Sequence, residues 1–149
     1  MDQRDLRQEA REALCDVGID QFNAEHCELL YNFFLLQSFL QEISERGERP
    51  EDWSQIEQSI AFLEEYAHTH LRAEETLMKA SNFAGFAAHK LSHDHFLSDF
   101  IAIKDKISQS HDLKYVHELN GFLIEWIFKH TSNVDMEYKG LLDLSKLEK

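Results

Sequence analysis

The sequence predicts an all-α fold, an antiparallel four-helix bundle whose helices alternate up, down, up and down. Four long segments repeat apolar residues every three or four positions, which is the spacing of one helix face. Glycine and proline are scarce, with 5 and 1 residues, as expected of a chain with few tight turns. The connections between the segments are short, and short connections place consecutive helices side by side in opposite directions.

The first two segments flank the polar run ERGERPED. Residues 23–44 carry an apolar stripe that consists of His26, Leu29, Leu30, Phe33, Leu36 and Leu40. Gly47 and Pro50 then end this helix. A second helix is predicted from Glu51 or Asp52 to Ala80, with Asp52 as its N-cap. Its stripe consists of Trp53, Ile56, Ile60, Leu63, Tyr66, Ala67, His70, Glu74 and Leu77.

The other two segments, residues 86–109 and 113–130, lie on either side of the polar break SQSHD. The stripe of the third helix consists of His89, His93, Phe96, Phe100, Ile103 and Ile107. The stripe of the fourth consists of Val116, Leu119, Leu123, Trp126, Ile127 and His130. Because the sequence has no internal repeat and no linker, we expect one domain over residues 1–149.

Composition and charge exclude several classes of partner. Asp and Glu (28) outnumber Lys and Arg (15), so the net charge is -13, and we expect neither nucleic acid nor membrane as a partner. The charged N-terminus lacks the apolar core of a secretion signal, and no run is long enough to span a bilayer. We therefore expect a cytoplasmic protein in which Cys15 and Cys27 are free thiols.

Five histidines and one glutamate lie on the predicted apolar stripes: His26, His70, Glu74, His89, His93 and His130. His70 and Glu74 are four residues apart and share one helix face, as do His89 and His93. A single inward histidine is usually a hydrogen-bonded core residue, but five in one small core would all need partners. Imidazole and carboxylate ligands that converge from facing helices indicate a metal site, and they leave iron, manganese and zinc open.

Asp135 is a further candidate ligand, which helical geometry alone does not place. It follows His130 by five residues, a spacing that turns it about 140° away from His130 on a regular helix. Both can face one site only if the helix ends or bends across residues 131–134. Thr131, Ser132 and Asn133 favour helices poorly, so they permit such a bend without requiring it.

The other four histidines are predicted not to bind metal. His68 and His95 lie two residues from a candidate ligand, which turns them about 200° around the helix and toward solvent. His111 falls in a loop, and His117 lies off the main stripe. Glu75 is about 100° away from the stripe of its helix and is expected to be solvated.

These residues, in this order, resemble the motifs of the hemerythrin family, especially the single-domain bacteriohemerythrins. The similar segments are Val17-Gly18-Ile19, Glu25-His26, the run from Tyr66 to Met78, and Trp126, His130, Asp135 and Tyr138. The resemblance covers about residues 15–144, the expected core of the domain. It implies a hemerythrin-like bundle around a non-haem di-iron centre with a hydroxo or oxo bridge.

The resemblance also implies a division of the ligands. His89, His93 and His130 would bind one iron, His26 and His70 would bind the other, and Glu74 and Asp135 would bridge the two. The second iron would keep one position open, at which dioxygen would bind reversibly. The implied function is therefore oxygen storage, delivery or scavenging.

Further residues follow from the same resemblance. Trp126, Ile127 and Tyr138 would line the oxygen pocket together with Phe33. The family usually has an acidic residue three positions before its first histidine ligand, where this chain has Asn23. This difference leaves open whether a carboxylate orients the ring of that ligand.

Two other functions stay open. An oxygen, redox or nitric oxide sensor would act through a separate partner protein, because few residues follow Asp135. An enzyme is disfavoured, because ferritin-like oxidases use two Glu-x-x-His motifs and here only Glu65 to His68 fits. We therefore expect an oxygen-binding protein rather than an enzyme, with a side peroxidase or oxidase activity left open.

Overall fold

All the regular secondary structure of residues 3–147, which the computed structural model describes, is helical. The α-helices are α1 (Gln3–Ala13), α2 (Asp20–Arg46), α3 (Asp52–Ala80), α4 (Phe86–Ser110) and α5 (Leu113–Lys129). α5 continues into η1 (His130–Val134) and η2 (Asp135–Tyr138), and η3 spans Leu144–Lys146. No strand occurs within the described residues, and the all-α prediction is confirmed.

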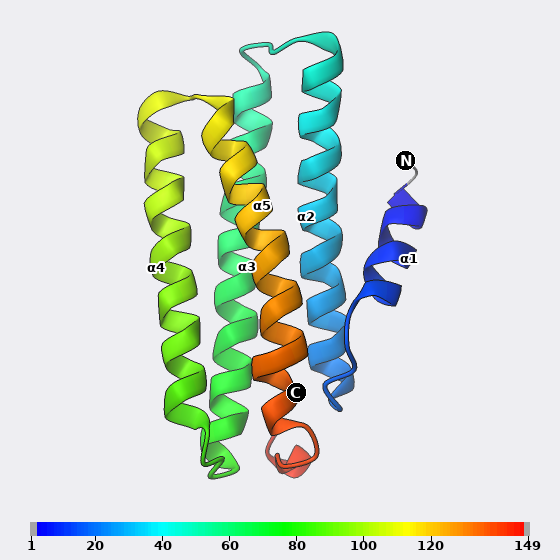
Figure 1. Ribbon diagram of the computed structural model, residues 1–149, viewed down its shortest axis with the longest axis vertical. Helices are drawn as coiled ribbons and strands as arrows, with labels where there is room; N and C mark the ends of the chain where they lie inside the picture. Colours follow the sequence, from blue (N-terminus) through cyan, green and yellow to red (C-terminus); the bar gives the residue numbers. More distant parts are fainter. Residues whose placement is uncertain (1–2, 148–149) are drawn as a thin grey trace.

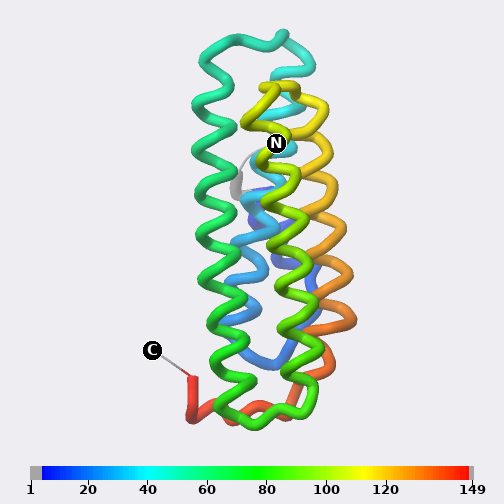
Figure 2. Tube along the Cα trace, turned by 90° about the vertical axis from the view of Figure 1, so that its left-hand side faces the viewer, coloured from blue at the N-terminus to red at the C-terminus, as the bar shows by residue number. Residues whose placement is uncertain are grey.

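The four long helices α2 to α5 lie side by side along the long axis of the molecule (Figure 1, Figure 2). Short connections at residues 47–51, 81–85 and 111–112 return the chain along the preceding helix. α2 and α4 each pack on both α3 and α5, so the four helices enclose one interior. None of the described helices combines the length and the apolar character that crossing a bilayer requires.

α1 is a fifth α-helix, in addition to the four long helices that the sequence predicts. α1 packs on α2, outside the other helices (Figure 1). Leu6 and Ala10, four residues apart, are buried and form a narrow apolar stripe in an otherwise charged segment. Arg7 pairs with Glu28 of α2, and its guanidinium carbon lies 4.0 Å from the ring centroid of Tyr31. These contacts hold a helix too polar to be recognised by its periodicity.

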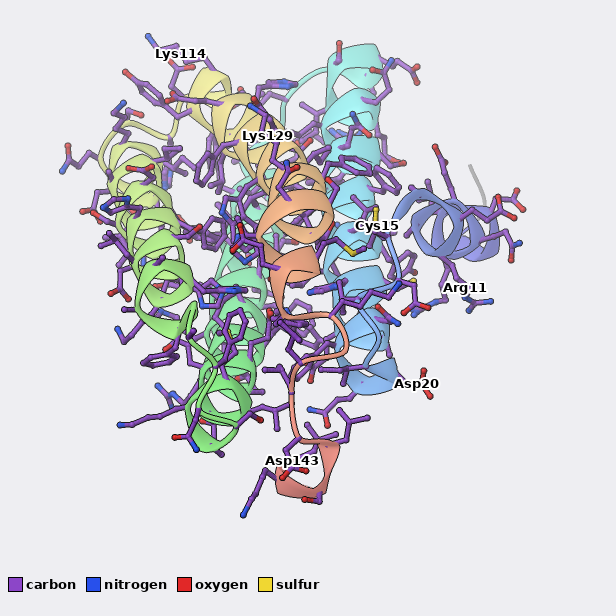
Figure 3. All side chains as sticks on the ribbon, turned by 60° about the horizontal axis from the view of Figure 1, so that its bottom comes forward. Arg11, Cys15, Asp20, Lys114, Lys129 and Asp143 are labelled. Atoms are coloured by element: carbon purple, nitrogen blue, oxygen red, sulfur yellow. The ribbon has the colours of Figure 1, made fainter. Side chains whose placement is uncertain are left out.

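The segment between α1 and α2 is held by Asn23. The Oδ1 atom of Asn23 accepts a hydrogen bond from the backbone N–H of Val17 at 3.0 Å, and its Nδ2 donates to Asp16 at 2.7 Å. Cys15 lies in this segment (Figure 3). Cys15 and Cys27 are both free thiols, as predicted.

The interior is divided into two apolar clusters. The larger draws on all five α-helices, and the smaller consists of Val17, Ile19, Phe22, Leu77, Met78 and Tyr138. On α2, His26 lies between Phe22 of the smaller cluster and Leu29 of the larger one. On α3, and along the chain from α5 to η2, the predicted ligands likewise lie where the chain passes from the larger cluster to the smaller one. The predicted ligands therefore form a polar layer between two apolar ones.

The turn between α2 and α3 is closed by Asp52. The prediction that Asp52 is the N-cap is wrong, because Glu51 occupies that position and the helix begins at Asp52. The buried carboxylate of Asp52 instead accepts hydrogen bonds from the Arg46 guanidinium at 2.7 Å and from the backbone N–H of Arg49 at 2.8 Å. The hydrogen bond from Arg46 lowers the pKa of Asp52 below its ordinary value.

We predict that Asp52→Asn destabilises the fold at neutral pH and that this loss disappears in acid. Because the fold lowers the pKa of Asp52, the contact with Arg46 contributes stability above the unfolded pKa of about 4. That stability is lost as the pH falls through the folded pKa. Urea unfolding of the chelator-treated protein at about pH 7 and about pH 3 measures both differences, with the exposed Asp105→Asn as control. A difference in unfolding free energy between the wild type and Asp52→Asn that is equal at both pH values would contradict the prediction.

Candidate metal centre

All seven residues predicted as metal ligands are buried in the polar layer. They are His26 on α2, His70 and Glu74 on α3, His89 and His93 on α4, His130 on η1 and Asp135 on η2. The pairs on α3 and α4 reach the interior together because residues four apart share a helix face. Three α-helices and the two short helices that continue α5 thus contribute donor atoms to one place.

Three histidines converge through their Nε2 atoms. Nε2 of His130 lies 3.1 Å from Nε2 of His89 and 3.1 Å from Nε2 of His93. Oδ1 of Asp135 lies 2.9 Å from Nε2 of His89 and 3.0 Å from Nε2 of His130. Donor atoms at these separations are spaced like neighbouring ligands of one first-row metal ion.

Two further histidines form a second, smaller group with Glu74. Oε1 of Glu74 lies 2.5 Å from Nε2 of His70 and 3.7 Å from Nε2 of His26. Oδ2 of Asp135 lies 3.2 Å from Nε2 of His26. This group therefore has two histidines where the other has three.

Each of the two carboxylates faces both groups with different oxygen atoms. Asp135 turns Oδ1 toward His89 and Oδ2 toward His26. Glu74 turns Oε1 toward His70 and Oε2 toward His89, from which it is 3.8 Å away. A carboxylate in this position can bridge two cations.

Asp135 reaches the cluster because the helix widens after α5. η1 is a π-helical turn, in which the backbone N–H of Asp135 donates to the carbonyl of His130, five residues back. The side chains of Thr131, Ser132 and Asn133 donate to carbonyls four residues back and so compete with regular helical hydrogen bonds. The wider turn brings residues five apart onto one face. It supplies the bend that the spacing of His130 and Asp135 requires.

Nine buried side-chain atoms in and beside this layer have no hydrogen-bond partner among the described residues. They include Nε2 of His26 and His70 and both oxygens of Glu74 and Asp135. Several approach one another within ion-pair distance but lack hydrogen-bond geometry. Burying unpaired polar atoms is costly, and cations among them would be a partner common to all. Five imidazoles and two carboxylates are a donor set that fits a pair of iron ions.

Two carboxylates outside the cluster orient the rings of ligand histidines. Oε1 of Glu25 lies 2.7 Å from Nδ1 of His70, and Oε2 of Glu75 lies 2.7 Å from Nδ1 of His93. An imidazole that donates its Nδ1 proton to a carboxylate presents Nε2 as the ligand atom. The prediction that Glu75 is simply solvated is wrong, because its side chain is half-buried and reaches His93 on α4.

His26 has no such partner. Its Nδ1 atom is buried without a hydrogen bond. Asn23, one turn earlier on α2, is engaged with Val17 and Asp16 instead. Asn23 therefore stabilises the segment before α2 and does not orient the ring.

The cluster holds both of its carboxylates ionised. Burial opposes ionisation, but the neighbouring histidines outweigh it and lower the pKa of Glu74 and of Asp135. Burial lowers the pKa of His93 to about 3, so this ring is neutral. For His70 the attraction of Glu74 and Glu25 outweighs burial and raises the pKa to about 10. A metal ion that binds His70 therefore displaces a proton.

The four remaining histidines lie outside both groups. His95 and His117 are exposed, and His68 is half-buried rather than fully solvated. His111 stacks on Trp53 with ring centroids 4.5 Å apart, at the turn between α4 and α5. Sequence spacing thus separated these residues from the candidate ligands.

Two of the three residues predicted to line an oxygen pocket stack on rings of the candidate ligands. Tyr138 is fully buried, its ring lies parallel to that of His89 with centroids 5.6 Å apart, and burial raises the pKa of its phenol. Trp126 is half-buried and stacks on His130 at 4.4 Å. Ile127 is fully buried, three residues before His130. Their part in an oxygen pocket stays a prediction.

The all-helical bundle and its buried layer of histidines and carboxylates place this protein among the helical proteins that can hold a metal site in the bundle interior. Comparison with protein families agrees with this class, since residues 17–142 match the Hemerythrin HHE cation binding domain. The chain belongs to the hemerythrin family. α1 precedes the matched region.

Curated proteins with related sequences are named as hemerythrins. Bacteriohemerythrin of Clostridium acetobutylicum is 28% identical over 123 residues, which cover 83% of this chain and 92% of that protein. The Hemerythrin-like protein of Naegleria gruberi is 31% identical over 85 residues, covering 56% and 63%. Bacteriohemerythrin of Methylococcus capsulatus is 28% identical over 85 residues, covering 57% and 64%. No solved structure matches significantly.

We predict that Glu74→Gln lowers the metal content of the protein far below that of the wild type. Glu74 faces both histidine groups, so the substitution removes one negative charge shared by both. The measurement is iron per chain after anaerobic loading with ferrous iron and removal of the excess. Glu65→Gln, exposed on the same helix, should load like the wild type. An undiminished iron content in Glu74→Gln would show that the site is elsewhere.

Glu75→Ala should weaken metal binding without abolishing it. Loss of a carboxylate that orients a ligand histidine reduces metal affinity by about 10- to 100-fold. Glu75→Gln keeps an acceptor for Nδ1 of His93 and should fall between the wild type and Glu75→Ala. Competition with a chelator of known affinity measures the order, and equal affinities in all three proteins would refute the orienting role.

Proposed function

We propose that this protein binds dioxygen reversibly at a non-haem di-iron centre, for oxygen storage, delivery or scavenging. Helices α2 to α5 would be the antiparallel four-helix bundle of one hemerythrin-like domain over residues 1–149. The observation that carries the proposal is the unequal division of the histidines, three in one group and two in the other, with both carboxylates facing both groups. The names of the relatives, bacteriohemerythrin and hemerythrin-like protein, support it.

The geometry supports a specific assignment of ligands. One iron would be held by His89, His93 and His130, the other by His26 and His70, and both by Glu74 and Asp135. The second group supplies one histidine fewer, so a small ligand has room there. Two iron ions in these positions would supply the electrons that reversible dioxygen binding requires.

The residues around the two-histidine group exclude water. Phe22 is fully buried and meets the ring of His70 edge-on, with centroids 5.7 Å apart. Tyr138 packs against Phe22 with centroids 6.3 Å apart and is fully buried as well. Because burial raises the pKa of Tyr138, its phenol holds its proton and is a poor acid. A dry surrounding without a ready proton donor favours release of a bound ligand over its further reduction.

The buried carboxylates set the charge of the centre. Glu74 and Asp135 are both ionised and fully buried, and no lysine or arginine side chain pairs with either in the described structure. Negative charges in an apolar interior need a cationic partner, which protonated His70 supplies in part until a metal ion displaces its proton. The arrangement therefore favours metal cations over a neutral organic cofactor.

The oxygen-binding proposal predicts a reversible optical change. The protein is loaded with ferrous iron without air, oxygen is added, and the visible spectrum is followed through repeated flushing with argon. We expect an absorption band that appears with oxygen, disappears under argon, and returns over several cycles. The exposed variant Glu65→Gln should behave like the wild type. Oxygen consumption with irreversible oxidation and no recoverable band would contradict the proposal.

A further inference from the structure

A series of stacked aromatic rings leads from one ligand histidine toward the surface. The indole of Trp126 stacks on His130 with centroids 4.4 Å apart and an interplanar angle of 18°. The same indole stacks on Phe96 at 3.9 Å and 27°, and Phe96 stacks on Phe122 at 5.5 Å and 16°. These rings join the adjacent helices α4 and α5 (Figure 1). The contact at Trp126 connects a π-system directly to the cluster.

The outer end of this series opens on a surface pocket of about 370 Å³. Its lining includes Trp126, Phe96, Phe122, Leu91, Ser92 and Asp99. Ser92 also places its Oγ atom 3.3 Å from Nδ1 of His130. The pocket therefore approaches His130 through both the indole and a hydrogen bond.

Trp126 differs from the other aromatic residues that contact ligand rings. Tyr138 stacks on His89 and Phe22 meets His70, but both are fully buried. Among residues 3–147, Trp126 is the aromatic side chain that both stacks on a candidate ligand and lines a surface pocket. Indole is also among the side chains that are most easily oxidised, unlike the phenyl rings beside it.

We propose that Trp126 is the electron-transfer contact through which a one-electron donor in solution reduces the oxidised centre. This inference rests on the proposed di-iron function. The donor loses one electron, one ferric ion gains it, and no bond forms or breaks. The contact lies at the three-histidine group, whereas the two-histidine group would receive oxygen.

The charge of the protein indicates which donors use this contact. The net charge is -13, and Asp99 lies in the pocket wall. A negative surface attracts cationic reactants and raises their rate of encounter, most strongly at low salt. The donor class is therefore a small cation that transfers one electron, for which hexaammineruthenium(II) is the probe.

The test compares reduction rates of the oxidised, iron-loaded variants Trp126→Leu and Trp126→Phe with that of the wild type. Stopped-flow mixing with hexaammineruthenium(II) should give a rate about tenfold lower for Trp126→Leu and an intermediate rate for Trp126→Phe. Trp53→Phe, which changes the other tryptophan at the far turn, should leave the rate unchanged. A wild-type rate in Trp126→Leu with normal iron content would overturn the proposal.

Two further measurements test the contact of Trp126 with the centre and the binding of oxygen separately. In Trp53→Phe, where Trp126 is the remaining tryptophan, iron loading should quench the fluorescence strongly, and unquenched emission would show that the indole does not contact the centre. If Trp126→Leu fails to hold iron, an unchanged rate in Trp126→Phe rejects the relay. The reversible oxygen band, recorded on the same samples, separates the two ideas. Its absence from the wild type refutes oxygen binding, while the reduction rates still decide the role of Trp126.

Discussion

The burial of seven polar ligand side chains between two apolar clusters is the constraint on which the rest of this structure depends. Nε2 of His26 and of His70 and all four carboxylate oxygens of Glu74 and Asp135 have no hydrogen-bond partner among the described residues, an arrangement that is unfavourable unless cations lie among them. α3 and α4 each supply two of the ligands, and the outer carboxylates Glu25 and Glu75 orient the rings of His70 and His93. The bundle, the packing and the orienting hydrogen bonds all follow from the need to place these groups together.

The π-helical turn at η1 shows how a local irregularity completes the site. On a regular α-helix Asp135 would face away from His130. The side chains of Thr131, Ser132 and Asn133 take up helix carbonyls and favour a wider turn. Asp135 then places one oxygen toward each histidine group. These three residues, which favour regular helices poorly, therefore allow Asp135 to join Glu74 as a second carboxylate that faces both histidine groups.

Much of this organisation could be predicted from the sequence, and the exceptions have physical causes. Apolar periodicity located the long helices, and the four-residue spacing of His70 and Glu74 placed both on one face. α1 was missed because only two of its residues, Leu6 and Ala10, form an apolar face, which is too short a periodic pattern to recognise in a charged segment. The role of Glu75 was missed because spacing gives an angle around one helix but not which neighbour packs there. The position of Asp52 depends on Arg46 across a turn, which no single-helix pattern contains.

The central claim is that the buried donors form one centre completed by two cations. The most direct test follows the urea midpoint of the metal-free protein as ferrous iron is added without air, because a ligand that binds only the folded state raises its stability. We predict a midpoint that rises steeply until about two equivalents of iron per chain and only slowly, with the logarithm of free iron, beyond that point. A midpoint that does not respond to iron, or whose steep rise ends at a single equivalent, would contradict this prediction.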